Sequence, residues 1–325
     1  MRTSRRQVLA GMGAMLIGAI SSKAHAQTYP SRPIRMIVPR APGGGSDIIA
    51  RTLAQGMQHK SGHPFIVENR PDASAVVGAV QVANATADGY TVFLADNAFY
   101  QNPAVIRKLP YDTLKDFSGV TMLAQAPVIL VTNPSVPASD VKSLVQYAKA
   151  NPGKLSYGSG GIGASTHLAG VLFNSAAGVD TIHVPFKSSG PALTALLGGT
   201  ISMQFGGISS ARPQIEAGKI RAIAVTGKRR DPSMPNVPTF EESGLAGVDI
   251  TSIWGIHAPA ATPLAPRRAL RDLFVEVMRT PEVTKRLYEQ GYDIIGSTPE
   301  EHDAETHRQV AFWLDLATRV KISAD

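Results

Sequence analysis

Four short loops rich in glycine and serine are the places in this sequence where a small anion would bind. They are Pro42-Gly43-Gly44-Gly45-Ser46, Ser159-Gly160-Gly161-Ile162-Gly163, Lys187-Ser188-Ser189-Gly190 and Gly206-Gly207-Ile208-Ser209. Each follows a β-branched run and precedes a stretch of helical periodicity, so its N–H groups would lie at a helix start. Those amides lack partners and carry the positive end of the helix dipole. A single loop of this kind is more simply a tight turn, but four together favour a carboxylate or phosphate site.

The second loop also raises the alternative of a dinucleotide-binding enzyme. Residues 158–163 match the Gly-x-Gly-x-x-Gly fingerprint, from Gly158 to Gly163, between a strand and a helix. The acid that would bind the ribose is missing, because Lys187 stands where that acid belongs. A lysine is compatible with a 2′-phosphate. An exported NADP-dependent oxidoreductase is therefore an alternative to a binding protein.

Other catalytic patterns are absent from the sequence. It contains no Gly-x-Ser-x-Gly elbow, no Walker loop and no cysteine. His59 and His63 have the spacing of a helical zinc motif, but Gly62 and Pro64 would end that helix. His167 follows Ser165 and Thr166 in a helix start, where it is equally a ligand contact or a packed side chain. We expect no catalytic residue, metal or cofactor.

The elements that position these loops alternate between strand and helix, which is typical of an α/β fold. Strands are predicted at 34–38, 64–68, 90–95, 155–158, 182–186, 201–205 and 220–225. One helix would begin at Ser46 or Asp47, another would be capped by Ser165 or Thr166, and a third would begin with Pro191. Further helices are predicted at 141–150, around 270–278 and at 304–320. The loops would share the carboxyl edge of each sheet, where ligands bind.

Two segments look like crossings between separate sheets. One lies near Leu130 and the other follows Asp249, through Ile253 and Trp254. Two crossings predict two lobes joined by a hinge, the first built from both ends of the chain. The predicted lobes are 27–127 plus 250–325, and 128–249.

The first 26 residues have the pattern of a signal peptide. Arg5 and Arg6 precede an apolar run that is too short to span a membrane, and Ala24-His25-Ala26 follows it. The arginine pair is compatible with twin-arginine export as well as with the general secretory route. Removing the segment lowers the formal charge from +7 to +3, because it contains four cations and no acid. A net charge of +3 does not indicate nucleic-acid binding. The lack of cysteine excludes disulfides and a lipid anchor on cysteine. We expect a periplasmic protein.

Several motifs in order along the chain resemble one family. They are Ile37-Val38-Pro39 with Pro42 to Asp47, Val67-Glu68-Asn69-Arg70-Pro71, Ala87-Asp88-Gly89-Tyr90-Thr91, Tyr157 to Gly161, Val184-Pro185-Phe186-Lys187 with Gly190-Pro191-Ala192, and Ala217 to Ala222. The chain resembles the periplasmic receptors of tripartite tricarboxylate transporters, the Bug family. The resemblance implies a two-lobed periplasmic-binding-protein fold of type II, with a Rossmann-like sheet in each lobe and two crossing hinge segments.

The resemblance also implies a function. Such a receptor captures a small organic carboxylate, such as a dicarboxylate or an aromatic acid, and delivers it to the membrane permease subunits of a tripartite transporter. An exported protein that only interacts with other proteins is a third class, and it would show no closure of a cleft. We expect a monomer. The residues expected to bind ligand are Arg40, Gly43, Gly44, Gly45, Ser46, Asn97, Ser159, Gly160, Ser165, Thr166, His167, Phe186, Lys187, Gly206 and Gly207.

Arg40 departs from the family pattern, which has an aromatic residue at this position. Its guanidinium would hold a second carboxylate through two parallel hydrogen bonds, which would favour a dianionic ligand. The alternatives are that Arg40 points to solvent or pairs with a nearby acid such as Asp72. Further departures, at residues 72–75 and 205–207, change the expected pocket wall, so a relative's ligand cannot be assumed.

Overall fold

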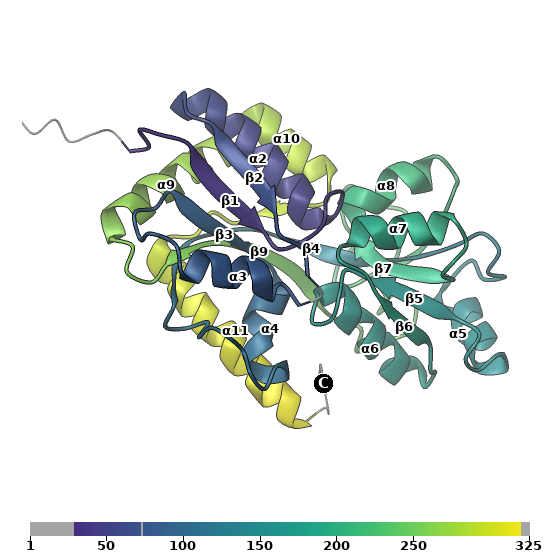
Figure 1. Cartoon of the computed structure of the whole chain (residues 1–325). Coiled ribbons are helices and arrows are strands. Elements are labelled where there is room, and N and C mark those ends of the chain that lie inside the picture. The colour runs from purple at the N-terminus through teal and green to yellow at the C-terminus, as the bar shows by residue number, and fades with distance from the viewer. Residues whose placement is uncertain (1–28, 73, 320–325) are drawn as a thin grey trace, which may run out of the picture.

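The computed structural model describes residues 29–72 and 74–319. The predicted signal peptide and Val320, the predicted end of the last helix, lie outside these residues. Two groups of elements lie side by side and are joined by long strands (Figure 1). None of the described helices has the length and apolar character needed to cross a bilayer.

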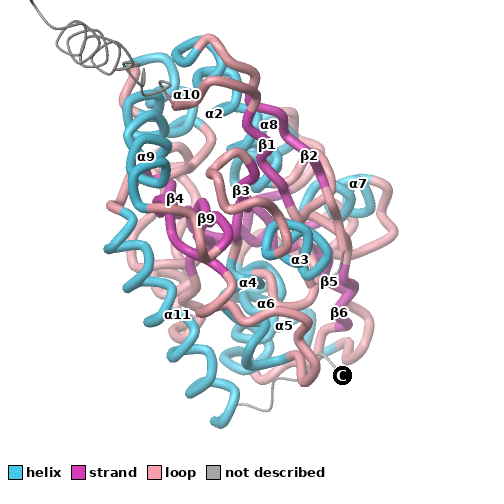
Figure 2. Tube along the Cα trace, turned by 60° about the vertical axis from the view of Figure 1, so that its left-hand side comes forward, coloured by secondary structure: helices cyan, strands magenta, loops and turns pink. Residues whose placement is uncertain are grey.

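Lobe 1 is built from both ends of the described chain. Its N-terminal elements are β1 (Ile34–Val38), α2 (Gly45–Ser61), β2 (Phe65–Asn69), α3 (Val76–Ala83), β3 (Thr91–Ala95) and α4 (Asn97–Val105). Its C-terminal elements are β9 (Thr251–Pro259), α9 (Leu264–Met278), α10 (Pro281–Glu289), β10 (Asp293–Ile294) and α11 (Pro299–Arg319). Strands β2, β1 and β3 are parallel, and β9 pairs antiparallel with β3. In Figure 2, α11 passes beside α4, which it contacts.

Lobe 2 is continuous in sequence. It contains α5 (Val141–Ala150), β5 (Ser156–Ser159), α6 (Ser165–Ala177), β6 (Ile182–Pro185), α7 (Ser189–Leu197), β7 (Met203–Gly207), α8 (Ile208–Glu216) and β8 (Arg221–Val225). Strand β5 lies between β6 and β7 and is parallel to both. Its core includes Phe205, whose ring packs against those of Tyr157, Phe173 and Phe240.

One long strand, β4 (Phe117–Thr132), belongs to both lobes. Residues 117–127 pair with β9, whereas residues 128–132 pair with β7 and β8. The sequence predicted this crossing near Leu130 but not the continuous strand that carries it. Strand β9 is the second crossing. The hydrophobic clusters change at the same point, because Ala126 packs in a lobe 1 cluster and Val128 in a lobe 2 cluster.

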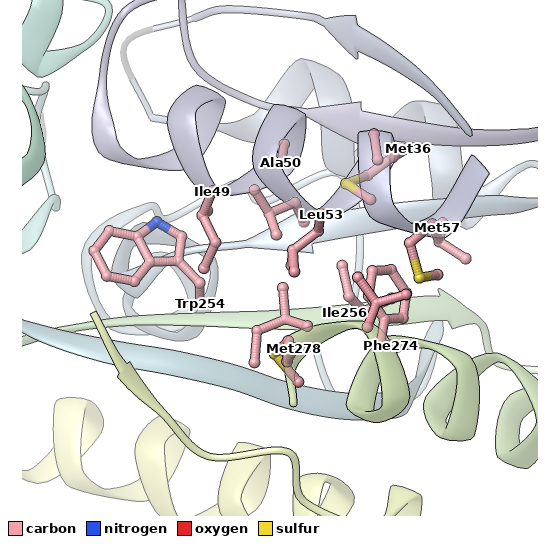
Figure 3. Packing of buried hydrophobic residues seen from close by; sticks show 14 of the residues in the cluster. Met36, Ile49, Ala50, Leu53, Met57, Trp254, Ile256, Phe274 and Met278 are labelled. Atoms are coloured by element: carbon pink, nitrogen blue, oxygen red, sulfur yellow. The ribbon is translucent and has the colours of Figure 1, made fainter. Parts of the chain in front are cut away.

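Helix α2 shows how the local sequence builds lobe 1. Ile49, Leu53 and Met57 follow the spacing of one helical face, and all three are fully buried. They pack toward β9 and α9, as Figure 3 shows for Ile256 and Phe274. Gly56 permits the close approach of α9, since a Cβ there would lie 2.5 Å from Val277 Cγ1.

Several predicted helix starts were wrong by a few residues. Helix α2 begins at Gly45 rather than at Ser46 or Asp47, and α11 begins at Pro299 rather than at residue 304. The N-cap of α6 is Ala164, and its side chain makes no capping hydrogen bond, so Ser165 and Thr166 lie inside the first turn. The N-cap of α7 is Ser188, which places Pro191 third in the helix rather than first. The serine and threonine residues at these two starts, Ser165, Thr166, Ser188 and Ser189, line a cleft between the lobes.

Candidate functional site: a cleft lined by helix N-termini

Helix N-termini from both lobes converge on one small cleft. Lobe 1 contributes the starts of α2 and α4, and lobe 2 contributes the starts of α6, α7 and α8. The lining residues are Arg40, Gly45, Ser46, Asp96, Asn97, Gly160, Ala164, Ser165, Thr166, Ser188, Ser189, Gly207, Ser252 and Trp254. The first amides of a helix have no intrahelical acceptor and carry partial positive charge. The cleft is therefore suited to an anion, and its volume is about 50 Å³.

The two lobes touch along one rim of this cleft. The Ala41 N–H donates a hydrogen bond to the Lys187 carbonyl oxygen at 3.1 Å. Beside it, a Cβ on Gly44 would lie 1.9 Å from Ser188 Oγ. The loop before α2 therefore packs closely against the start of α7 at Gly44.

Arg40 lies inside the cleft and is 3% exposed. Its Nε donates to Asp96 Oδ2 at 2.6 Å, and its Nη2 donates to Asp96 Oδ1 at 3.2 Å. Its Nη1 reaches across the cleft and donates to the Gly160 carbonyl oxygen at 2.9 Å. The prediction that Arg40 points to solvent is wrong, because its side chain is buried. The alternative that it pairs with an acid is confirmed, but the acid is Asp96 and not Asp72, which instead accepts hydrogen bonds from the N–H groups of residues 74, 76 and 77.

Strand β9 and Asn97 form the hinge side of the cleft. Asn97 Nδ2 donates to the Thr251 carbonyl oxygen at 2.9 Å, and Asn97 Oδ1 accepts from the Ile253 N–H at 3.0 Å. Two further residues of β9 contact the starts of α2 and α6. Trp254 Nε1 donates to Ser46 Oγ at 2.9 Å, and the hydroxyls of Ser165 and Ser252 are 2.6 Å apart. The hinge strand is thus hydrogen-bonded to helix starts in both lobes.

In the loop that matches the dinucleotide fingerprint, backbone N–H groups already donate hydrogen bonds to nearby side chains of lobe 2. The Gly160 N–H donates to Thr166 Oγ1 at 2.8 Å, the Gly161 N–H to Ser159 Oγ at 3.2 Å, and the Gly163 N–H to His167 Nδ1 at 3.3 Å. A pyrophosphate would need these donors. The geometry of this loop does not favour the oxidoreductase alternative.

Two histidines pack behind this loop. The rings of His167 and His183 stack with their centroids 4.2 Å apart, and His183 Nε2 lies 2.7 Å from Ser159 Oγ. Burial, and then the nearby His167, lowers the pKa of His183 to about 4. Burial also lowers the pKa of His167. Both rings are therefore neutral near pH 7, and they support the loop from within lobe 2.

The structure brings about half of the residues that sequence reasoning selected to the cleft. Those that line it are Arg40, Gly45, Ser46, Asn97, Gly160, Ser165, Thr166 and Gly207. Ser159, His167, Phe186 and Gly206 lie outside the lining. Gly43 and Gly44 contact the start of α7, and the Lys187 side chain is exposed, with only its carbonyl joining the lobes. That these residues bind a ligand stays a prediction.

Sequence reasoning missed several lining residues. Asp96, Ser252 and Trp254 were not selected, and neither were Ala164, Ser188 and Ser189. Asp96 directly follows β3 and caps α4 by accepting from the Ala98 N–H, so its position before a helix was an available signal. Ser252 and Trp254 come from β9, which enters the site by pairing distant in sequence and gives no local signal.

A larger groove, of about 850 Å³, lies on the other face of the hinge. Alternate residues of β9 face the two spaces, Thr251 and Ile253 lining the groove while Ser252 and Trp254 line the cleft. The groove is otherwise bordered mainly by α11 and shares with the cleft only Asn97, at the start of α4, among the described residues. We therefore place the candidate ligand site in the smaller cleft.

The chain is similar in sequence and in structure to known proteins of one family. The chain is 32% identical to the protein BugT of Bordetella pertussis over 310 residues, covering 94% of this chain and 95% of that protein. A solved structure described as a periplasmic transporter is 41% identical with a TM-score of 0.88, over 91% of this chain and 100% of the other. The structure of R. palustris Rpa4515 with adipate is 31% identical with a TM-score of 0.86, over 89% and 97% of the two chains.

The family model of the tripartite tricarboxylate transporter family receptor matches residues 49–311. This match confirms the family suggested by the sequence motifs, and the similarity to solved periplasmic binding proteins confirms the two-lobed periplasmic-binding fold. Members of the family are solute-binding receptors rather than enzymes. The chain belongs to the tripartite tricarboxylate transporter receptor family.

Proposed function

We propose that this protein captures a small organic carboxylate between its two lobes and delivers it to the membrane permease of a tripartite transporter. One observation carries the proposal: the N-termini of α2, α6, α7 and α8 converge on a cleft of hydroxyl and amide groups. The related structure with adipate, a carboxylate, supports this ligand class. The predicted signal peptide supports delivery to the periplasm.

The predicted lobe limits belong to the same proposal. Residues 27–127 with 250–325 would move as one body, and residues 128–249 as the other. The bending points would then lie within β4 and at the start of β9, the two segments shared by both lobes. Closure around a ligand is the motion expected of such a receptor.

A thermal-shift screen of organic acids tests the proposal. A ligand that binds only the native state raises the free energy of unfolding by RT ln(1 + [L]/Kd). We expect at least one acid to raise the Tm, and NADP in the same panel to leave it unchanged. Stabilisation by NADP alone would instead support the oxidoreductase alternative.

Small-angle scattering with the acid identified by the screen separates a receptor from a protein that only interacts with other proteins. When the acid is added, a receptor should become more compact, because a larger fraction of the molecules is closed. A protein that only interacts with other proteins should give the same scattering curve with and without the acid. Uptake of that acid by cells with and without the gene would then test delivery to a permease.

A further inference from the structure

The cleft contains a buried ion pair between two of its own residues. The side chains of Arg40 and Asp96 are 4% and 11% exposed. The carboxylate accepts from two nitrogens of the guanidinium, in the arrangement that a bound carboxylate would adopt. The third nitrogen donates to Gly160. Asp96 thus occupies the face of Arg40 that the sequence suggested for a second carboxylate of the ligand.

This pair sets the charge of the cleft. Among the described residues that line it, Arg40 and Asp96 are the charged ones, so their formal charges cancel. Attraction for an anion then comes from the helix N-termini, each of which carries roughly half a positive charge. One carboxylate can be held in this way. A second would be buried next to Asp96 without a cation of its own, which is unfavourable.

We propose that Asp96 is a specificity-determining residue that, by holding Arg40, makes the cleft select small monocarboxylates over dicarboxylates. This inference rests on the proposed function and names its substrate class. The cleft is also much smaller than the groove behind the hinge, about 50 Å³ against about 850 Å³, which favours a small ligand. This selectivity for monocarboxylates is the reverse of the preference for a dianion that Arg40 suggested in the sequence alone.

Asp96→Asn isolates the effect. Asparagine has nearly the same shape and is also a good N-cap, so it can still accept from the Ala98 N–H at the start of α4. It removes the negative charge that cancels the positive charge of the Arg40 guanidinium. Calorimetric titrations would use acids matched in chain length: propionate, butyrate and valerate against malonate, succinate and glutarate.

We expect the native protein to bind its best monocarboxylate at least tenfold more tightly than the matched dicarboxylate. In Asp96→Asn the ratio should shift by tenfold or more toward the dicarboxylate, since a hydrogen-bonded ion pair has about that effect on affinity. Binding of the dicarboxylate should also weaken with added salt. Asp96→Glu, which restores the charge, should restore the native order.

The matched control is Asp140→Asn. Asp140 caps α5 by accepting from the Ser143 N–H and does not line the cleft, so this variant loses the same charge at a similar cap. Its preference should equal that of the native protein. An equal shift in both variants, or no shift in Asp96→Asn, overturns the inference while leaving carboxylate binding intact. If none of the six acids binds to any of the folded proteins, the inference fails, whereas the proposed function fails only if the wider thermal-shift panel of organic acids also gives no ligand.

Discussion

Gly190 at the start of α7 and Gly43 before α2 meet through their backbones. A Cβ on Gly190 would lie 2.8 Å from the Gly43 carbonyl carbon and 2.9 Å from its oxygen. Neither atom can move out of the way by changing a rotamer. The contact between the lobes at this rim therefore requires glycine at position 190.

Gly190→Ala should accordingly hold the lobes apart. Alanine favours the helix itself, so we expect α7 to form and the affinity for the best ligand to fall by tenfold or more. Scattering and calorimetry measure the two effects. The control is Gly198→Ala, where a Cβ would meet nothing closer than 3.5 Å. If the Gly190→Ala variant closes and binds like the native protein, this contact is not part of closure.

Arg40→Met should destabilise the protein. Methionine retains much of the apolar stem but leaves the Asp96 carboxylate buried without its partner, which costs about 3–5 kcal/mol. Urea unfolding measures the loss. The double variant Arg40→Met/Asp96→Asn should recover part of it, because no charge is then left unpaired. Equal midpoints for the native protein and the single variant would contradict the buried pair.

Stability should fall as the pH drops below about 6.5, in part because of His257 and His302. Burial lowers the pKa of His302 to about 3 and lowers that of His257 as well, whereas both titrate near about 6.5 in the unfolded chain. The unfolded chain then binds more protons, so this contribution is complete above pH 6.5 and is lost as the pH falls toward the folded pKa.

The slope is at most about 1.4 kcal/mol per pH unit for each histidine. Urea unfolding at several pH values from 7 to 4.5 measures it. His302→Gln should be less stable at pH 7, because it loses the contact between His302 Nε2 and the Tyr100 hydroxyl at 3.2 Å, and its slope should be smaller. Parallel slopes in the two proteins would mean that His302 takes up no proton on unfolding.

Trp254 should report ligand binding. The sequence contains two tryptophans, and Trp254 lines the cleft while Trp313 lines the groove behind the hinge. In Trp313→Phe, the remaining indole donates to Ser46, so a ligand at the start of α2 should change its emission in a saturable way. Trp254→Phe should give no such change. A signal that follows Trp313 instead would move the candidate site to the groove.

The local parts of this fold could be predicted from the sequence because their causes are local. Strand β1 and helix α5 have the predicted bounds, the first from a β-branched run and the second from a capping box at Asp140 with helical periodicity. The convergence of helix starts also followed from a general property, since the loops after parallel strands share one edge of the sheet.

The partner of Arg40 could not be predicted in the same way. Asp96 lies 56 residues further along the chain and Gly160 lies 120 further, and their contacts depend on how the two lobes meet. Trp254 enters the cleft only because β9 inserts beside β3, which no periodicity in its own segment indicates. Such contacts arise from packing between elements that are distant in sequence.

The position of β9 in lobe 1 affects the order in which the chain can fold. It lies between β3 and β4 in the sheet, with Ala95 paired to Gly255, so this sheet is incomplete until nearly the whole chain is present. Elements α5 to β8 of lobe 2 follow one another without interruption and need only the end of β4. The lobe that contains the N-terminus of the fold is therefore the one that finishes last, and its early strands keep an unpaired edge until β9 arrives.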